Sequence, residues 1–302
     1  MTSDSPGPVS PKEPLAATRS PANTDPSPHQ PCPACASAAG AGPGGDPSRY
    51  IYALGQVQPR YPSLSAEKEI AQVIGRAETA KLTDRQVIHQ VLARRQNRYL
   101  ARQLCWVLAI QGLDTYLLQP RDPADLDLLI EALRPEPSPQ DQDVVVGVRG
   151  PIAPPEMCNG LMVPVVIFDQ LYSFDRDAFI KSISRPDTIP EERFRPAAAA
   201  MFDRIIQMTG NVGAADEQRA LNYLAVRYPA IYARTAEAFS QEASLSAVNV
   251  RGSQLGGLRR IVEVILSYTN RKTDVTEKFF VRVDVTEEFP FLVTKLTPYF
   301  DR

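Results

Sequence analysis

Tyr50-Ile51-Tyr52-Ala53-Leu54-Gly55 is the stretch at which the sequence changes character. Its aromatic and β-branched residues are typical of a β-strand, so we expect ordered structure to begin here. Upstream, residues 1–48 consist mainly of Pro, Ser, Ala, Gly and Thr, and they hold eleven of the 28 prolines. A segment so poor in large apolar side chains cannot bury enough surface to offset its ordering entropy, so we predict that it is disordered.

Two helices are predicted after this strand. Ser63 or Ser65 can cap the first helix, in which the apolar residues of 70–74 form a stripe. The second helix begins near Thr83-Asp84 and leads into a basic run that ends at Arg102.

The middle of the chain predicts strands that flank a short helix. Strand-like runs cover residues 105–108, 115–118, 143–148 and 161–168. The first two form a predicted hairpin, and Asp122-Pro123 supplies the Asp cap and first-turn proline of the short helix. Between the last two strands lies a Pro- and Gly-rich loop, Arg149 to Gly160, which we expect to be rigid.

The last third of the sequence predicts helices followed by strands. Helical patterns cover residues 196–208, 217–227 and 230–239, and strand patterns cover 261–268, 279–285 and 291–296. The fold class is therefore α+β. We predict a mixed α/β module with a core sheet over residues 49–185. A second module over 186–302, helical and then an antiparallel β-meander, packs on the first.

Charge and composition exclude several classes of partner. Lys and Arg number 33 and Asp and Glu 35, which gives a formal net charge of -2. This balance does not favour nucleic-acid binding, which needs a basic surface. No window reaches the roughly 18 apolar residues of a membrane span, and the N-terminus lacks the features of a secretory signal. We therefore expect a cytoplasmic protein with reduced cysteines that binds neither nucleic acid nor membrane.

The inventory of catalytic residues is short. The chain has two histidines, and only His89 lies in a segment predicted to fold. Serine and cysteine hydrolases need an imidazole beside the nucleophile, and no Gly-x-Ser-x-Gly motif accompanies His89. No phosphate-binding glycine motif is present either. We therefore predict no catalytic residues, while carboxylate or lysine chemistry stays open.

Cys32 and Cys35 are the candidate metal ligands. Their Cys-x-x-Cys spacing lets two thiolates bind one Zn²⁺, but a structural zinc site needs four ligands. His29 or a second chain could complete the site, and a redox-active dithiol or an inert pair are the alternatives. The remaining cysteines, Cys105 and Cys158, lie far along the chain in apolar settings, and we expect Cys105 in the core.

Two groups of residues are candidates for binding a peptide or a partner protein. Arg94 and Arg98 belong to the basic run of the second helix and could meet an acidic peptide. Arg149, Glu156 and Asn159 lie in the loop between the core strands, and loops held by rigid scaffolds often carry function.

Several stretches resemble one known family. They are Tyr50 to Leu64, Asn97 to Trp106, Tyr116 to Asp125, Gly147 to Pro151 and Val281 to Phe291. They are similar to the domain of unknown function at the C-termini of PatA and PatG, multidomain proteins of cyanobactin biosynthesis. The similarity runs from about Cys32 to the C-terminus, and cysteines just before the Tyr-x-Tyr-Ala-Leu-Gly stretch are typical of this family.

The resemblance implies a supporting role. In PatA and PatG this domain follows a subtilisin-like protease domain, and no such domain precedes the matching stretches here. We expect a noncatalytic module that binds a precursor peptide or the enzymes that mature it. An enzyme with an unrecognised site, and a homodimer linked by zinc, remain the alternatives.

Overall fold

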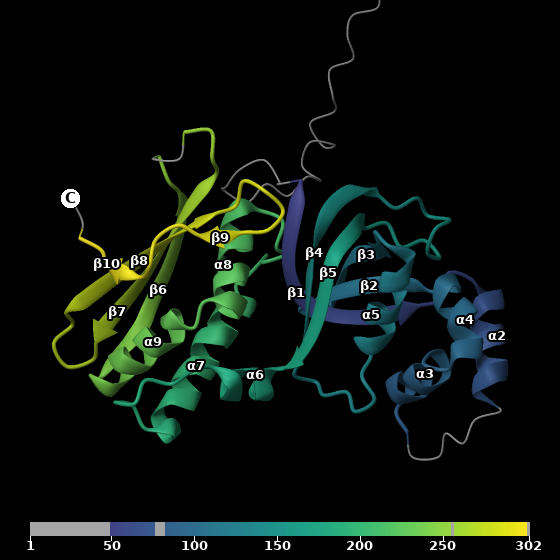
Figure 1. Cartoon of the computed structure of the whole chain (residues 1–302), viewed down its shortest axis with the longest axis horizontal. Coiled ribbons are helices and arrows are strands. Elements are labelled where there is room, and N and C mark those ends of the chain that lie inside the picture. The colour runs from purple at the N-terminus through teal and green to yellow at the C-terminus, as the bar shows by residue number, and fades with distance from the viewer. Residues whose placement is uncertain (1–48, 76–81, 255–256, 301–302) are drawn as a thin grey trace, which may run out of the picture. The chain divides into compact units, whose positions relative to one another are not determined.

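Five strands close into a barrel in the first part of the chain (Figure 1). The structure, a computed structural model, describes residues 49–75, 82–254 and 257–300. The barrel strands are β1 (Tyr50–Arg60), β2 (Cys105–Ile110), β3 (Leu113–Pro120), β4 (Asp141–Ile152) and β5 (Pro164–Asp175). Their order is β1-β2-β3-β5-β4, and β4 closes the barrel by pairing with β1. Neighbours run antiparallel, except that β3 and β5 run parallel.

Alternate residues of β1 face opposite sides of the barrel wall and so enter two different cores. Ile51 and Ala53 lie in the inner core, whereas Tyr52 and Leu54 lie in an outer core shared with the last part of the chain. The inner core also receives helices that pack beside the barrel. These are α2 (Leu64–Ile74), α3 (Asp84–Leu92), α4 (Arg98–Gln103) and α5 (Leu126–Glu131), with the short 3-10 turns η1 (Arg95–Asn97) and η2 (Pro123–Asp125).

The predicted cap of the first helix and the predicted start of the second are confirmed. Ser63, rather than Ser65, caps α2 by accepting a hydrogen bond from the backbone N–H of Ala66 at 3.3 Å. Thr83 caps α3, and the side chain of Gln86 reaches back to the Thr83 N–H at 2.9 Å. These reciprocal bonds satisfy backbone donors that a helix leaves unpaired.

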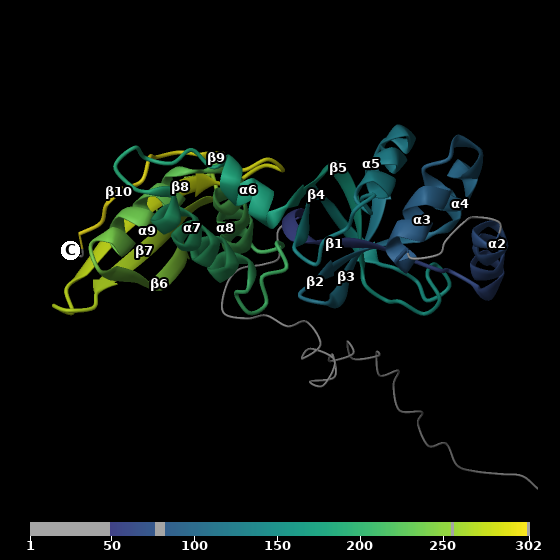
Figure 2. The same cartoon turned by 90° about the horizontal axis from the view of Figure 1, so that it is seen from below.

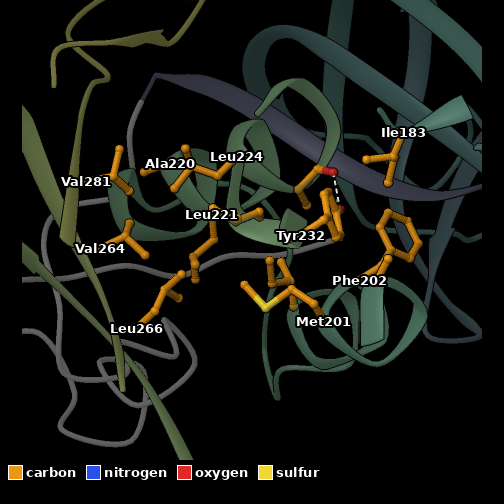
Figure 3. Packing of buried hydrophobic residues seen from close by; sticks show 14 of the residues in the cluster. Ile183, Met201, Phe202, Ala220, Leu221, Leu224, Tyr232, Val264, Leu266 and Val281 are labelled. Carbon is orange, nitrogen blue, oxygen red and sulfur yellow. Dashed lines mark hydrogen bonds between the residues drawn. The ribbon is translucent and has the colours of Figure 1, made fainter. Parts of the chain in front are cut away.

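The outer core lies between four helices and a second sheet, sheet B (Figure 2). The helices are α6 (Arg176–Ser182), α7 (Glu191–Ile206), α8 (Asp216–Arg227) and α9 (Ala230–Ser240). Sheet B contains β6 (Ala243–Gly252), β7 (Ile261–Asn270), β8 (Thr276–Asp284), β9 (Phe291–Leu292) and β10 (Thr297–Pro298). Figure 3 shows Val264, Leu266 and Val281 of sheet B facing Ala220 and Leu221 of α8. Within the described ranges, every helix falls short of the length and apolarity that crossing a membrane requires.

Gly213 brings the connection between α7 and α8 against the barrel. Its carbonyl accepts the Tyr52 N–H at 2.9 Å, and Asn222 Nδ2 donates to the Tyr52 carbonyl at 2.8 Å. Gly213 has a φ of 72°, and a Cβ atom there would collide with the Tyr52 backbone. Glycine is therefore required at this position both by the backbone conformation and by the close approach.

The predicted α+β class is confirmed, with several differences in detail. β4 runs on to Ile152, so the loop that we expected from Arg149 begins only after that residue. Pro151 was expected in that loop, yet it lies in β4, whose register against β5 shifts between Val146 and Gly147 and again between Arg149 and Ile152. β5 begins at Pro164 rather than Leu161, and α6 and β6 were not predicted. Of residues 291–296, only Phe291–Leu292 pairs as a strand.

Candidate functional site

Cys105 and Cys158 are joined by a disulfide that fastens a loop to the outside of the barrel. Cys105 opens β2, and Cys158 belongs to residues 153–163, which connect β4 to β5 and are called the strap below. The two Cα atoms lie 6.0 Å apart, and both side chains are buried. The expected core position of Cys105 is confirmed. The expectation of unlinked cysteines is wrong for this pair, because a contact over 53 positions depends on the tertiary fold.

The strap is ordered by its own backbone hydrogen bonds. Ala153 donates to Val163 at 2.9 Å, Met157 to Pro154 at 3.0 Å, and Gly160 to Pro155 at 2.8 Å. Its buried residues pack on apolar side chains that point out of the barrel. The cluster contains Cys105, Val107, Leu117, Ala153, Cys158 and Val165. The strap is therefore an ordered loop that packs on the outer face of the barrel.

A groove of about 400 Å³ opens between the strap and α4. We call it the Trp106 groove, because it contains the single tryptophan of the chain. Trp106 is buried, and its Nε1 donates to the Ala101 carbonyl at 2.9 Å. The lining residues come from α4, β2, β3, η2, α5 and the strap: Ala101 to Trp106, Leu117 to Pro120, Pro123, Leu126 and Met157. Most of these side chains are apolar, so the groove offers a surface for an apolar ligand.

None of the five predicted binding residues is among those that line this groove, but Arg98 and Glu156 lie close in sequence to residues that do. Arg98 is one helical turn before Arg102, which lines the groove, and residues four apart share a helix face. Arg94 is exposed just before η1. On the other side, Glu156 precedes Met157 in the strap, and Asn159 is exposed with a φ of 46°. Arg98 also pairs with Asp127 of α5, so its charge is partly offset.

Arg149, the fifth predicted residue, lies elsewhere. It lies in β4 and pairs with Val166 of β5, whose side chain faces the inner core. Burial raises the pKa of Tyr116 to about 12, and the positive charge of Arg149 counteracts part of this increase. Within the described part of the chain, the buried Nε of Arg149 has no hydrogen-bond partner. The structure therefore does not bring Arg149 together with Glu156 and Asn159, which belong to the strap on the outer face.

The structure gives little support to the residues that were considered for metal binding or catalysis. Cys32 and Cys35 lie outside the described residues. The described ranges contain no cluster of three or more His, Cys, Asp or Glu side chains arranged to hold a metal. His89 lies on α3, where burial lowers its pKa, and in the same ranges its Nδ1 has no hydrogen-bond partner.

A second polar cluster lies away from the groove. Arg121, just after β3, donates through Nη2 to Asp169 of β5 at 2.7 Å, and its Nε makes a second bond to the same carboxylate. Asp169 also hydrogen-bonds Glu288, in the connection between β8 and β9. Burial, followed by the bond to Asp169 and its charge, raises the pKa of Glu288 to about 7, whereas Arg121 lowers the pKa of Asp169. Below a pH of about 7 the cluster thus pairs a neutral acid with an ionised one.

Arg219 of α8 holds this cluster in place. Its side chain is fully buried and donates to the carbonyls of Val285 at 2.7 Å and Glu288 at 3.1 Å, and also to that of Glu287. Sequence reasoning missed Arg121, Arg219 and Glu288. Their roles depend on contacts between distant segments, for which the local sequence carries no signal.

The fold and the sequence point to the same relatives. Residues 188–299 match the family model described as PatG C-terminal. The resemblance to the PatG C-terminal family is confirmed. A solved structure described as "PatG Domain of Unknown Function" has the same fold, with a TM-score of 0.68 and 20% identity. This match covers 83% of the present chain and 99% of that chain. The PatG C-terminal model spans α7 to β10, so it does not reach the Trp106 groove. No curated protein matches the chain.

Proposed function

We propose that this chain is a noncatalytic binding module in the maturation of ribosomally made, modified peptides of the cyanobactin type, and that the Trp106 groove holds a precursor peptide. The observation that carries the proposal is the groove itself, with an apolar lining and one arginine-bearing rim. The resemblance to the PatG C-terminal family supplies the pathway, since that domain occurs in proteins of cyanobactin biosynthesis.

The charge distribution selects the chemistry of the peptide. Arg102 of α4 is exposed and lines the groove, and Arg94 and Arg95 are exposed at the start of η1, which precedes α4. An apolar peptide segment next to Asp or Glu residues would bury its apolar side chains and keep its carboxylates at this rim. Ion pairs between these carboxylates and the arginines would steer association and fix the orientation of the peptide more than they add affinity. The preferred ligand is therefore an extended, acidic-flanked apolar segment.

Trp106 provides a direct readout of binding. Tryptophan-free peptides are titrated into the protein while its fluorescence is recorded, and every change then reports the groove. We expect saturable binding for the acidic-flanked peptide and a loss of about tenfold in affinity, ~1.4 kcal/mol, when its acidic residues are replaced by Lys. Equal affinity for both peptides would contradict the charge assignment.

Two pairs of variants locate the site. Met157→Glu places a charge in the groove and should abolish binding, whereas Met162→Glu, on the same strap but not in the lining, should leave it unchanged. Arg102→Glu should weaken binding about tenfold by reversing a rim charge, while Arg204→Glu on exposed α7 should not. If no precursor peptide binds, or if Met157→Glu binds normally, the proposal fails.

A further inference from the structure

The Cys105–Cys158 disulfide is the covalent link between the strap and β2. Within the described part of the chain, the backbone hydrogen bonds of residues 153–163 have both donor and acceptor inside the strap, as in the bond from Ala153 to Val163. These bonds shape the loop but do not attach it to β2. The attachment to β2 therefore consists of the disulfide and the apolar packing around it.

The disulfide joins two sides of the Trp106 groove. Cys105, at the start of β2, lines the groove itself. Cys158 follows Met157, the residue through which the strap contributes to the lining. The bond holds the two Cα atoms 6.0 Å apart. Breaking it releases the strap from β2, so the position of Met157 in the groove depends on the state of the two sulfurs.

The turn that carries Cys158 includes an unfavourable backbone conformation. Asn159 and Gly160, which follow the cysteine, have φ angles of 46° and 84°. This left-handed region is unfavourable for a residue with a side chain, although asparagine tolerates it better than most. Such conformations persist where the surrounding structure holds them, and they are common in switch regions. The disulfide at Cys158 is one such restraint, and its loss lets Asn159 return to a more favourable conformation.

A reductant can reach the disulfide through the groove. Both cysteine side chains are buried, but Cys105 lines the groove, so a small thiol that enters the groove meets the Cys105 sulfur. Arg102 lines the same groove, and a positive charge favours the thiolate form that attacks a disulfide. A peptide bound in the groove would block this path. Occupancy of the groove and reduction of the disulfide are therefore coupled in both directions.

We propose that the Cys105–Cys158 disulfide is a redox switch that controls peptide binding in the Trp106 groove. In the oxidised form the strap is fixed as one wall and the groove binds the peptide, whereas in the reduced form this wall is released and binding weakens. One thiolate of the glutathione class attacks the Cys105 sulfur, which forms a mixed disulfide and expels Cys158 as a thiolate that takes up a proton. A second such thiol breaks the mixed disulfide, so Cys105 is also left as a thiol and the two reductant molecules leave as one disulfide. The inference rests on the proposed function and adds its regulation.

The experiment compares the oxidised and reduced forms of the full chain. Cys32→Ser and Cys35→Ser are introduced together, so that every thiol that is counted belongs to the Cys105–Cys158 pair. Thiol titration after treatment with oxidised glutathione should find no free thiol, and a phosphine reductant should release both cysteines. Hydrogen exchange should then be faster in the strap of the reduced form and unchanged in β1. Titrations of the acidic-flanked peptide, followed by tryptophan fluorescence, should give an affinity about tenfold lower in the reduced form.

A variant without the two cysteines is the matched control. Cys105→Ala/Cys158→Ala should bind the peptide as weakly as the reduced form and should not respond to the reductant. Saturating peptide should also slow the reduction of the oxidised protein by glutathione. The switch is overturned by equal strap exchange in the two forms, by equal peptide affinity, or by a pair that stays reduced in oxidised glutathione.

Strap exchange keeps this inference apart from the proposed function, because it is measured without peptide. If neither form binds the peptide, the proposed function fails, and the control of peptide binding fails with it. Faster strap exchange in the reduced form would then still show that the disulfide fixes the wall of the groove. If the oxidised form binds the peptide and reduction changes neither affinity nor exchange, the proposed function stands and the switch alone is wrong.

Discussion

Glu288 and Asp169 face each other carboxylate to carboxylate, although one follows β8 and the other lies in the barrel strand β5. Two ionised carboxylates would repel each other in such a contact. The bidentate bond from Arg121 keeps Asp169 ionised, so the proton resides on Glu288. The pair therefore couples the ionisation of the cluster to the attachment of the loop at residues 285–290.

Stability should respond to the ionisation of Glu288. The folded carboxyl retains its proton up to a pKa of about 7, whereas the unfolded one loses it near its ordinary pKa of 4.5. Between these values the folded state binds more protons, so stability falls as the pH rises through this window and levels off above it. Glu288→Gln mimics the neutral acid. Thermal melts should therefore show a flatter pH profile for Glu288→Gln and a higher Tm than wild type at pH 8.

Glu287→Gln is the matched control, because Glu287 is the exposed neighbour on the same loop. Its pH profile should follow that of the wild type. If Glu288→Gln and wild type lose stability in parallel between pH 5 and 8, then Glu288 is not the group that titrates.

A buried carboxylate inside the barrel should be costly to remove. Asp143 is fully buried and accepts hydrogen bonds from the Val57 N–H and the Ser173 hydroxyl. Asp143→Ala leaves both donors without a partner and should lower the free energy of unfolding by about 2–4 kcal/mol. Ser173→Ala removes one bond and should cost about 1 kcal/mol. Urea titrations measure both, and equal losses would contradict the role of Asp143 as the shared acceptor.

Arg219 should determine the order of the 285–290 loop. Arg219→Met removes the donors to three carbonyls from a buried position and should cost roughly 3–5 kcal/mol. Hydrogen exchange should then rise in the loop before it rises in β7. Arg204→Met, on an exposed face of α7, should change stability by less than about 0.5 kcal/mol. A loop that stays protected in Arg219→Met would show that other contacts hold it.

Alanine substitutions at two glycines should distinguish the cost of backbone strain from the cost of a steric clash. Gly210 and Gly213 both have positive φ, 73° and 72°, but only at Gly213 would a Cβ atom meet the Tyr52 backbone. Gly210→Ala should cost about 1 kcal/mol through the left-handed conformation alone. Gly213→Ala should cost about 2 kcal/mol more, because the close contact must open. Equal effects in chemical denaturation would mean that the connection relaxes away from the barrel without penalty.

Local signals in the sequence predicted much of the fold. Tyr50 to Gly55 marks the start of β1, and Ser63 and Thr83 cap the helices that follow. The Asp122-Pro123 pair opens a 3-10 turn that continues into α5. Each of these features depends on hydrogen bonds or steric limits within a few residues, so the local sequence specifies them.

Features that depend on distant contacts were not predicted. Closure of the barrel requires β4 to pair with β1, and the sequence of neither strand indicates which strand it pairs with. The strand β6 was missed because Ala243 to Val250 alternates small and polar residues with few large apolar ones. The candidate site shows the same division. Arg98 of α4 and Glu156 of the strap were predicted and lie close in sequence to residues that line the Trp106 groove, but the groove itself and the contact between Cys105 and Cys158 arise only from folding.

The alternation of β1 has a consequence for how the molecule melts. Because one strand contributes Ile51 to the barrel interior and Tyr52 to the layer formed with α8, neither core is complete without it. Heat should therefore disrupt both cores in a single cooperative transition, with calorimetric and van 't Hoff enthalpies that agree. A fragment that stops after β5 would expose Tyr52, Leu54 and Val146 to water and should aggregate rather than fold as an independent domain.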